Sequence, residues 1–223
     1  MPEKMNSVIY MFLAKLLPRR LLSQQARRPS GFIGRFVMSN IFTKVNHDLN
    51  CFVEATLNLQ PSNHVLEIGF GPGKLINKMA SITTEGHIEG IDFSESMLAE
   101  AFKNNEQYIS LDKVGIQKGD CRELKYGNNT FDKVCSVNTL YFWNPPEKYL
   151  SEIYRVLKPG GHVVLGIRNA EQMSTLALDK NIFNTYSLNE AVDLLLNAGF
   201  ANAHFQEKEG TPFTSYCVVG TKL

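Results

Sequence analysis

One short stretch of the chain combines an acidic residue with three closely spaced glycines, a combination that can bind a small polar ligand. The apolar run 64–70 predicts a strand; it contains Glu67 and Gly69, and Gly71 and Gly73 follow it. Glycine lets the backbone turn sharply and approach a ligand closely, because it has no Cβ atom. A carboxylate near the end of the strand disfavours a pyrophosphate but accepts hydrogen bonds from a cationic amino group. The stretch therefore indicates a site for a nucleoside that carries an amino acid rather than for a dinucleotide.

The elements around this stretch predict an α/β fold. From residue 64 onward, β-rich runs alternate with helical patterns, which is typical of a parallel sheet with helices on both faces. Strands are predicted near 64–70, 87–92, 114–119, 133–139 and 162–168, with helices near 74–81, 94–105 and 145–157 between them. Two further acids, Asp92 and Asp120, lie at the ends of the second and third strands. Because open α/β sheets bind ligands at the carboxyl ends of their strands, these acids and Glu67 are expected at one site.

Several helix boundaries carry local signals. Asn144 and Pro145 supply a cap residue and a first-position proline for the third of these helices. Ser187 and Glu190 have the spacing of a capping box and predict the start of a further helix. The Lys-Pro-Gly-Gly segment 158–161 is expected to end a helix before the fifth strand.

The C-terminal part breaks the alternation. The runs 200–209 and 214–223 are β-rich and have no helix between them, which predicts an antiparallel hairpin. The expected fold class is α/β: a Rossmann-like three-layer sandwich with a seven-stranded, mostly parallel sheet, the antiparallel C-terminal hairpin and an N-terminal helical cap. Residues 1–58 are expected to form the cap or lid, and residues 59–223 a single globular domain.

Composition limits the possible partners. With 223 residues and a net charge of +1, the chain is long enough for one sizeable core and is not suited to bulk binding of nucleic acid. The four cysteines have neither zinc-site spacing nor a disulfide framework, so reduced thiols, no metal site and a cytoplasmic protein are expected. They are Cys51, Cys121, Cys135 and Cys217.

The charge is unevenly spread. Residues 1–35 carry seven Lys or Arg against one Glu, a net charge of +6 that leaves −5 for the rest. The apolar segment 8–17 within them is too short to span a bilayer. It is either a helix that packs on the domain or a membrane-surface anchor with Arg19 and Arg20 at its end. The sequence leaves both interpretations open, and with them a peripheral membrane contact through residues 1–35.

Taken in order, the motifs resemble those of class I S-adenosylmethionine-dependent methyltransferases, in the group that includes small-molecule and quinone methyltransferases. The resemblance covers about residues 59–223. It rests on the Glu-Ile-Gly-Phe-Gly-Pro-Gly segment 67–73, the strand ends at Asp92 and Asp120, and the Leu-Lys-Pro-Gly-Gly segment 157–161. It implies S-adenosylmethionine as cofactor and S-adenosylhomocysteine as product.

The resemblance also implies roles for the residues around the methionine part of this cofactor. The backbone of Gly69, Gly71 and Gly73 faces that part, and Glu67 lies near its amino group. Asn138, at the mouth of the site after the fourth strand, is a further cofactor-binding candidate.

A second set of roles concerns the nucleoside. Asp92 is expected to bind the two ribose hydroxyls, the position of an acid in dinucleotide folds as well. Phe93 and Met97 flank the adenine by resemblance. Asp120 accepts the adenine amino hydrogen, and the neighbouring Cys121 is included as a contact.

The acceptor side has weaker signals. Methyl transfer from a sulfonium is an in-line displacement that depends mainly on positioning, and it needs a general base only if the nucleophile arrives protonated. Tyr141 and Trp143 either line the pocket in which the methyl group is transferred or pack in the core. By their chemistry alone, His47 and His162 are candidate general bases. The alternative is that they are structural histidines. Arg168, at the end of the predicted fifth strand, pairs with an acidic substrate or faces water.

These patterns predict a methyltransferase that acts on a small molecule, with a lipophilic acceptor as one option. The alternatives are a non-catalytic S-adenosylmethionine-binding partner protein and a nicotinamide-dependent oxidoreductase, which the acid before the glycines disfavours. Gly31 and Gly34 are candidate hinges of a lid, and the strip 27–32 faces either the substrate or phosphate head groups. The acceptor, the methylated atom and the oligomeric state stay open.

Overall fold

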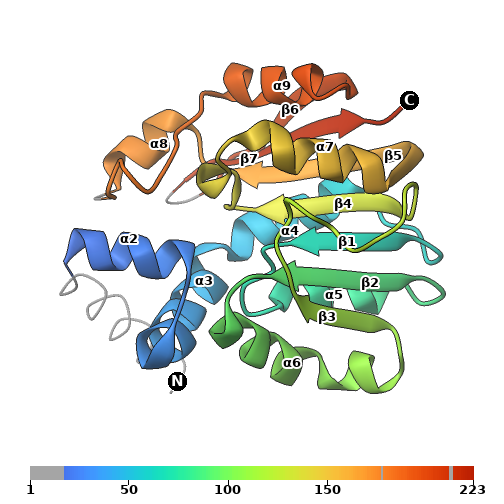
Figure 1. Ribbon diagram of the computed structural model, residues 1–223, viewed down its shortest axis with the longest axis horizontal. Helices are drawn as coiled ribbons and strands as arrows, with labels where there is room; N and C mark the ends of the chain where they lie inside the picture. Colours follow the sequence, from blue (N-terminus) through green and yellow to red (C-terminus); the bar gives the residue numbers. More distant parts are fainter. Residues whose placement is uncertain (1–17, 177, 211–212) are drawn as a thin grey trace.

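The computed structural model describes residues 18–176, 178–210 and 213–223. Within them the chain forms a seven-stranded sheet with the order β3-β2-β1-β4-β5-β7-β6 (Figure 1). The strands are β1 (His64–Ile68), β2 (His87–Asp92), β3 (Val114–Lys118), β4 (Phe131–Val137), β5 (Leu157–Ile167), β6 (Ala201–Lys208) and β7 (Ser215–Thr221). Strands β1 to β5 pair in parallel, and β7 runs antiparallel to both β5 and β6. The predicted Rossmann-like sheet with its C-terminal hairpin is confirmed.

Helices cover both faces of this sheet. They are α2 (Arg19–Arg27), the π-helix η1 (Ile33–Met38), α3 (Ser39–Val45), α4 (His47–Leu57), α5 (Lys74–Ile82), α6 (Glu95–Ser110), the short 3-10 helix η2 (Leu140–Phe142), α7 (Pro146–Val156), α8 (Ala170–Thr175) and α9 (Leu188–Asn197). Helix α2 lies on the side of the molecule toward which the arrowheads of the parallel strands point (Figure 1). The N-terminal helices are therefore near the edge of the sheet where ligands bind in this fold.

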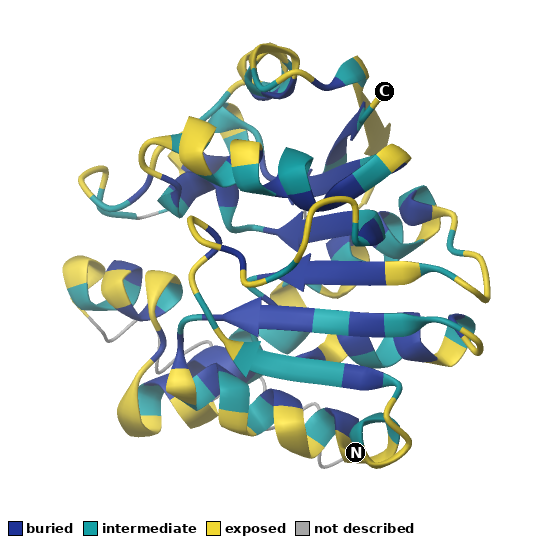
Figure 2. Ribbon diagram, turned by 45° about the vertical axis from the view of Figure 1, so that its right-hand side comes forward, coloured by how far each residue is buried: buried dark blue, intermediate teal, exposed yellow. Residues whose placement is uncertain are grey.

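The strands alternate their side chains between two hydrophobic cores, one on each face. In β1, Leu66 and Ile68 pack with the α7 and α9 side, whereas Val65 packs with the α4 and α5 side. The central strands are buried along most of their length (Figure 2). Burial on both faces explains the short apolar runs within these strands, such as Val65 with Leu66 in β1 and the run 163–165 in β5. Each fully buried aliphatic side chain contributes about 1.5–3 kcal/mol.

Two boundaries differ from the expectation. Helix α7 begins at Pro146 after the extended residue Pro145, and no side chain caps it, so the prediction of Asn144 as cap is wrong. The Pro-Pro pair is the physical reason for the later helix start. Pro145 precedes a proline, and a residue before proline disfavours the helical region. Strand β5 begins already at Leu157, which pairs with Phe131 across an irregularity, so the Gly-rich segment does not separate helix from strand.

Other boundaries agree with the expectation or extend it. The capping box at α9 is confirmed, since Ser187 and Glu190 exchange their side-chain to backbone hydrogen bonds. Helix α6 continues to Ser110, and α8 was not predicted.

The predicted cap contains one helix that belongs to the sandwich. Leu49, Val53 and Leu57 of α4 are buried against the sheet in the same core as Val164. The cap is thus formed by α2, η1 and α3 among the described residues, while the division at residue 58 stays a prediction. The segment 8–17 lies outside the described residues. In the described ranges, no helix has the length and apolar character to cross a membrane.

Candidate functional site

The glycine-rich turn after β1 is built for close approach. Gly69, Gly71 and Gly73 all have left-handed backbones, with φ of 71°, 55° and 73°. A Cβ atom at Gly69 would clash with the Thr139 side chain. At Gly71 it would meet only the Phe42 ring at 3.8 Å, so this part of the turn borders open space.

Asp92, at the end of β2, is tied to this turn. One carboxylate oxygen accepts from the Gly71 amide at 3.0 Å, and the other accepts from the Ser94 amide at 2.8 Å. The residue is buried, and this burial raises the pKa of Asp92 to about 6, while the two amides oppose the rise. The carboxylate is therefore ionised at neutral pH and retains unused lone pairs.

Glu67 has a buried carboxyl group with an orphaned oxygen. Its Oε2 is shielded from solvent and has no hydrogen-bond partner among the described residues. Burial and then the nearby Asp92 raise the pKa of Glu67 well above its usual value. A buried, unpaired carboxyl oxygen is costly unless a ligand completes it. A cationic amino group is the chemical complement of this atom.

Asp120 lies in the loop after β3 and is paired with a residue that the motifs did not single out. Arg122 Nη2 lies 2.6 Å from Asp120 Oδ2, and the Arg122 amide donates to Oδ1 at 2.9 Å. This pairing holds the pKa of Asp120 below its ordinary value. The neighbouring Cys121 is buried, which raises the pKa of its thiol and keeps it neutral.

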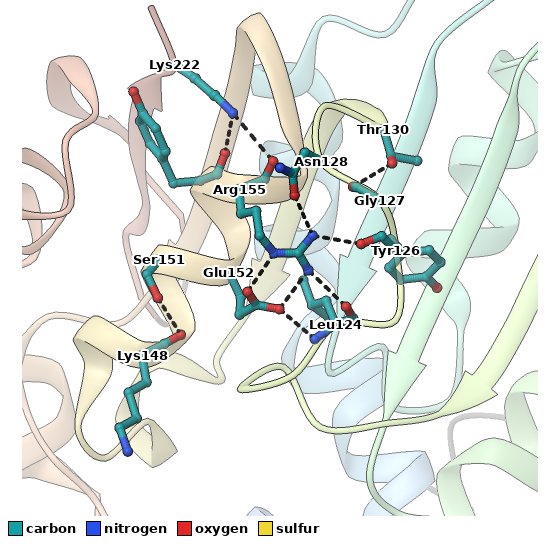
Figure 3. Close-up of polar contacts among 11 residues, drawn as sticks. Leu124, Tyr126, Gly127, Asn128, Thr130, Lys148, Ser151, Glu152, Arg155 and Lys222 are labelled. Atoms are coloured by element: carbon teal, nitrogen blue, oxygen red, sulfur yellow. Dashed lines mark hydrogen bonds and ion pairs between the residues drawn. The ribbon is translucent and has the colours of Figure 1, made fainter.

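A hydrogen-bonded clamp fixes the far end of the same loop. Arg155 of α7 donates to the carbonyls of Leu124 and Tyr126 and pairs with Glu152 at 2.7 Å (Figure 3). Glu152 in turn accepts from the Leu124 amide at 2.8 Å. The far end of the loop that carries Asp120 is thus held by helix α7.

One cavity of about 1330 Å³ brings most of the predicted residues together. Its lining includes nine of the ten cofactor-binding candidates: Glu67, Gly69, Gly71, Asp92, Phe93, Met97, Asp120, Cys121 and Asn138. Gly73 does not line it and instead precedes α5. The helical cap supplies another wall, which includes Leu22, Ala26, Pro29, Met38 and Phe42.

Polar contacts join the strand ends to the cap and to Asn46, which follows α3. Ser94 donates its hydroxyl to the Pro29 carbonyl at 2.6 Å, beside Asp92. Asn138 donates its side-chain amide to Asn46 Oδ1 at 2.9 Å. No local sequence signal could have indicated these pairs, because their members lie far apart in the chain.

The aromatic candidates of the acceptor side are fixed and buried. The Tyr141 hydroxyl accepts from the Arg168 amide and lies 3.1 Å from Asn138 Oδ1, to which it can donate. Burial raises the pKa of Tyr141, so its phenol stays protonated. Trp143 stacks on Tyr149 with a centroid distance of 5.3 Å. Both candidates line the cavity and also pack in the core.

The two histidine candidates lie outside this cavity. His47 is exposed at the start of α4, whose apolar face turns toward the sheet, and its Nε2 lies 3.8 Å from Cys51 Sγ. His162 lies within β5, where burial and the nearby Lys133 lower its pKa. Neither side chain is placed to act as a base on a ligand in the cavity.

Comparisons with known proteins agree with this geometry. A family model described as a methyltransferase domain matches residues 66–165. The "uncharacterized methyltransferase YdaC" of Bacillus subtilis is 29% identical over 182 residues, which are 82% of this chain and 96% of that protein. The demethylmenaquinone methyltransferase of Symbiobacterium thermophilum is 32% identical over 111 residues, 49% of this chain and 44% of its own length. The chain thus spans less than half of that relative.

Among solved structures, an S-adenosylmethionine-dependent methyltransferase from Aquifex aeolicus aligns with a TM-score of 0.70 and 20% identity over 83% of this chain and 97% of that chain. This likeness concerns the fold. The matched domain and the YdaC relative, together with the ordered motifs and the orphaned Glu67 oxygen in the cavity, identify the chain as a class I S-adenosylmethionine-dependent methyltransferase, with S-adenosylmethionine as its cofactor.

Proposed function

We propose that the chain methylates a small molecule with a large apolar part. The observation that carries the proposal is the division of the cavity. Its acids, Glu67, Asp92, Asp120 and Glu123, come from β1, β2 and the loop after β3, whereas the opposite side is largely apolar. A volume of about 1330 Å³ also exceeds the range of about 300–1,000 Å³ for a single small-ligand pocket. The cavity has room for a cofactor and an acceptor together.

The acidic half suits the cofactor, which supplies an electrophilic methyl group when bound. Glu67 is proposed to accept a hydrogen bond from its amino group, and Asp92 from its ribose hydroxyls. Phe93 and Met97 would flank the adenine, and Asp120 retains acceptor capacity beside Arg122.

The apolar half suits the acceptor. Besides the aromatic run after β4 and the side chains of α2 and η1 given above, its lining includes residues from α3, α8 and the segment that follows α8. These residues are Ile41, Phe42, Met173, Leu176, Leu178, Ile182 and Phe183. Such a wall excludes water and positions an apolar body for in-line transfer. Because no histidine lines the described cavity, we propose a nucleophile that arrives ionised or with a free lone pair. A quinol-like ring is one candidate, given the demethylmenaquinone methyltransferase relative.

The cap is proposed to act as a lid with one hinge. Gly31 has a φ of +59° and no atom within 4 Å of the place of a Cβ, so it can change conformation freely. At Gly34, a Cβ would lie 2.5 Å from the Pro29 carbonyl carbon, which indicates close packing rather than a hinge.

We also propose that the cap touches a membrane surface. Phe32 and Phe36 are exposed, at 74% and 42%, and their ring centroids lie 4.8 Å apart with the rings tilted by 38°. Three exposed arginines, Arg27, Arg28 and Arg35, surround this pair in the sequence. Aromatic side chains beside basic ones favour anionic lipid surfaces.

Calorimetric titration with S-adenosylhomocysteine, followed by a turnover assay, tests the function. Asp92→Ala is expected to weaken binding at least about tenfold, by loss of charge-assisted hydrogen bonds. Asp193→Ala, an exposed acid on α9, is the matched control and leaves the affinity unchanged. Formation of S-adenosylhomocysteine from S-adenosylmethionine with quinol and phenol acceptors supports transfer. Tight binding without turnover on any acceptor would instead favour a non-catalytic binding protein, and a thermal shift with NAD or NADP alone would favour the oxidoreductase.

A further inference from the structure

Arg168 directly follows β5, on the side of the cavity away from the acidic residues. Its backbone is fixed by Tyr141, whose hydroxyl accepts from the Arg168 amide and lies 3.2 Å from the Arg168 carbonyl oxygen. Arg168 lines the cavity, and so does Val45, the residue that its side chain contacts. The proposal that follows rests on the proposed methyl transfer.

The Arg168 side chain is buried without a carboxylate. Only 9% of the residue is exposed. Its guanidinium donates one hydrogen bond, from Nη2 to the Val45 carbonyl at 3.2 Å, and lies over the Phe213 ring at 4.5 Å. Within the described ranges it has no ion pair, unlike Arg155 with Glu152 and Arg122 with Asp120.

Such an arrangement is costly in the ligand-free protein. A guanidinium taken out of water loses solvation that only a paired anion restores well. Burial accordingly lowers the pKa of Arg168, and the influence that opposes this effect comes from the Tyr141 phenol rather than from a carboxylate. Four of its five N–H groups have no acceptor among the described residues, which leaves the planar fork free for an oxyanion.

We propose that Arg168 binds an anionic group of the methyl acceptor, a carboxylate or a phosphate. Basic residues also line the part of the cavity that holds the acids, but Arg122 there is paired with Asp120, and Lys118 with Glu95. Arg168, at the end of β5, has no ion pair among the described residues, so its charge is left to attract an anion. The acceptor is then an amphiphile: its apolar body contacts the wall that includes Met173 and Phe183, and its anion pairs with Arg168. This pairing orients the acceptor and selects it against neutral analogues of the same shape.

Binding of matched probe pairs to the full chain saturated with S-adenosylhomocysteine tests this inference. The pairs are benzoate with benzamide, decanoate with decanamide, and phenyl phosphate with phenol. At least one anion is expected to bind about tenfold or more tightly than its neutral partner, as a bidentate charge-assisted contact predicts. The carboxylate and phosphate arms show which oxyanion is preferred.

Substitutions distinguish specific recognition of the anion by Arg168 from an effect of the net charge and from an effect on folding. Arg168→Gln removes the preference, and Arg168→Lys retains part of it, because the ammonium keeps the charge but loses the fork. Arg20→Gln, an exposed arginine of α2, changes the net charge equally and keeps the full preference. Affinity for S-adenosylhomocysteine stays within about twofold in all variants, since Arg168 lies away from the acids.

The outcomes distinguish the two proposals. No binding of S-adenosylhomocysteine would overturn the proposed function. Three results would overturn this inference alone, provided that S-adenosylhomocysteine binds normally. The unmodified protein shows no preference for the anions, it binds no anionic probe at all, or the preference survives in Arg168→Gln.

Discussion

Two buried carboxyl groups, Glu67 and Asp92, dominate the chemistry of the cofactor half of the cavity. Asp92 has amide partners for both oxygens, whereas Glu67 has an oxygen with none among the described residues. Their burial raises both pKa values in the ligand-free protein. Ligand groups that donate hydrogen bonds favour the ionised forms and lower these values again. Binding and protonation are therefore linked.

The affinity for S-adenosylhomocysteine is expected to fall as the pH drops through 6. A carboxyl with a pKa of about 6 is only about one quarter ionised at about pH 5.5, so Asp92 alone contributes about a fourfold loss relative to about pH 7.5. Proton release by Glu67 adds to this loss. Asp92→Asn binds weakly and lacks this component, because its amide does not titrate. An unchanged pH profile in Asp92→Asn would contradict the assignment.

The same shift affects folding in the opposite sense. The Asp92 carboxyl holds its proton more tightly in the folded chain than in the unfolded one, where its pKa is near 3.8. Its contribution to the stability of the ligand-free protein is thus present below about pH 4 and is lost as the pH rises through about 6.

Glu67 predicts proton release on binding. Because burial raises the pKa of its carboxyl well above the usual value, pairing with a cationic amino group should lower that pKa again and release protons to the buffer. Calorimetry in buffers with different ionisation enthalpies measures this release. Glu67→Gln is expected to bind more weakly and to release fewer protons. Equal release by both proteins would show that Glu67 does not face the amino group.

Single residues differ in how far the sequence can predict them. The acids at the strand ends can be predicted from the sequence, because each follows a recognisable strand or precedes a glycine turn. The burial of Arg168 cannot be predicted in this way, since it depends on how separate elements pack. The pairing of Asp120 with Arg122 depends on the local turn of the loop after β3. His47 and His162 were chosen for their chemistry alone, and neither lies in the cavity.

The loop after β3 depends on helix α7 for its position. Arg155 and Glu152 bind three backbone groups of this loop, at Leu124 and Tyr126 (Figure 3). Arg155→Ala leaves Glu152 and two carbonyls without their partner, so stability should fall by about 2 kcal/mol. The affinity for S-adenosylhomocysteine should fall as well, because the same loop carries Asp120.

Lys148→Ala is the matched control for this prediction. Lys148 is an exposed residue of the same helix, and its ammonium group makes no hydrogen bond in Figure 3. Chemical denaturation and titration of both variants compare them. Equal effects of the two substitutions would show that the clamp does not position the loop.

Among the elements, the alternating pattern predicted the sheet and its hairpin well, because period and turn residues are local. The errors at α7 and β5 have local causes too: a second proline moved the helix start, and a glycine pair that suggested a break lies within a strand. The placement of α4 on the sheet could not be predicted, since an amphipathic helix can cover either a sheet or a ligand.

Taken as a whole, the molecule places a cap of α2, η1 and α3 over a cavity with an acidic and an apolar half. If this cap also contacts lipid, the exposed pair Phe32 and Phe36 should matter. The double substitution of both by serine is expected to abolish co-sedimentation with phosphatidylserine vesicles, while Phe102→Ser, an exposed aromatic of α6, should not. Equal sedimentation of the two variants, or no binding by the unmodified chain, would contradict the membrane proposal.

A crystal structure of the full chain with S-adenosylhomocysteine would show directly where the ligand binds. We expect the amino group at Glu67, the ribose hydroxyls at Asp92 and the adenine between Phe93 and Met97, with the apolar half left open. Binding in the apolar half, or an amino group away from Glu67, would contradict this expectation.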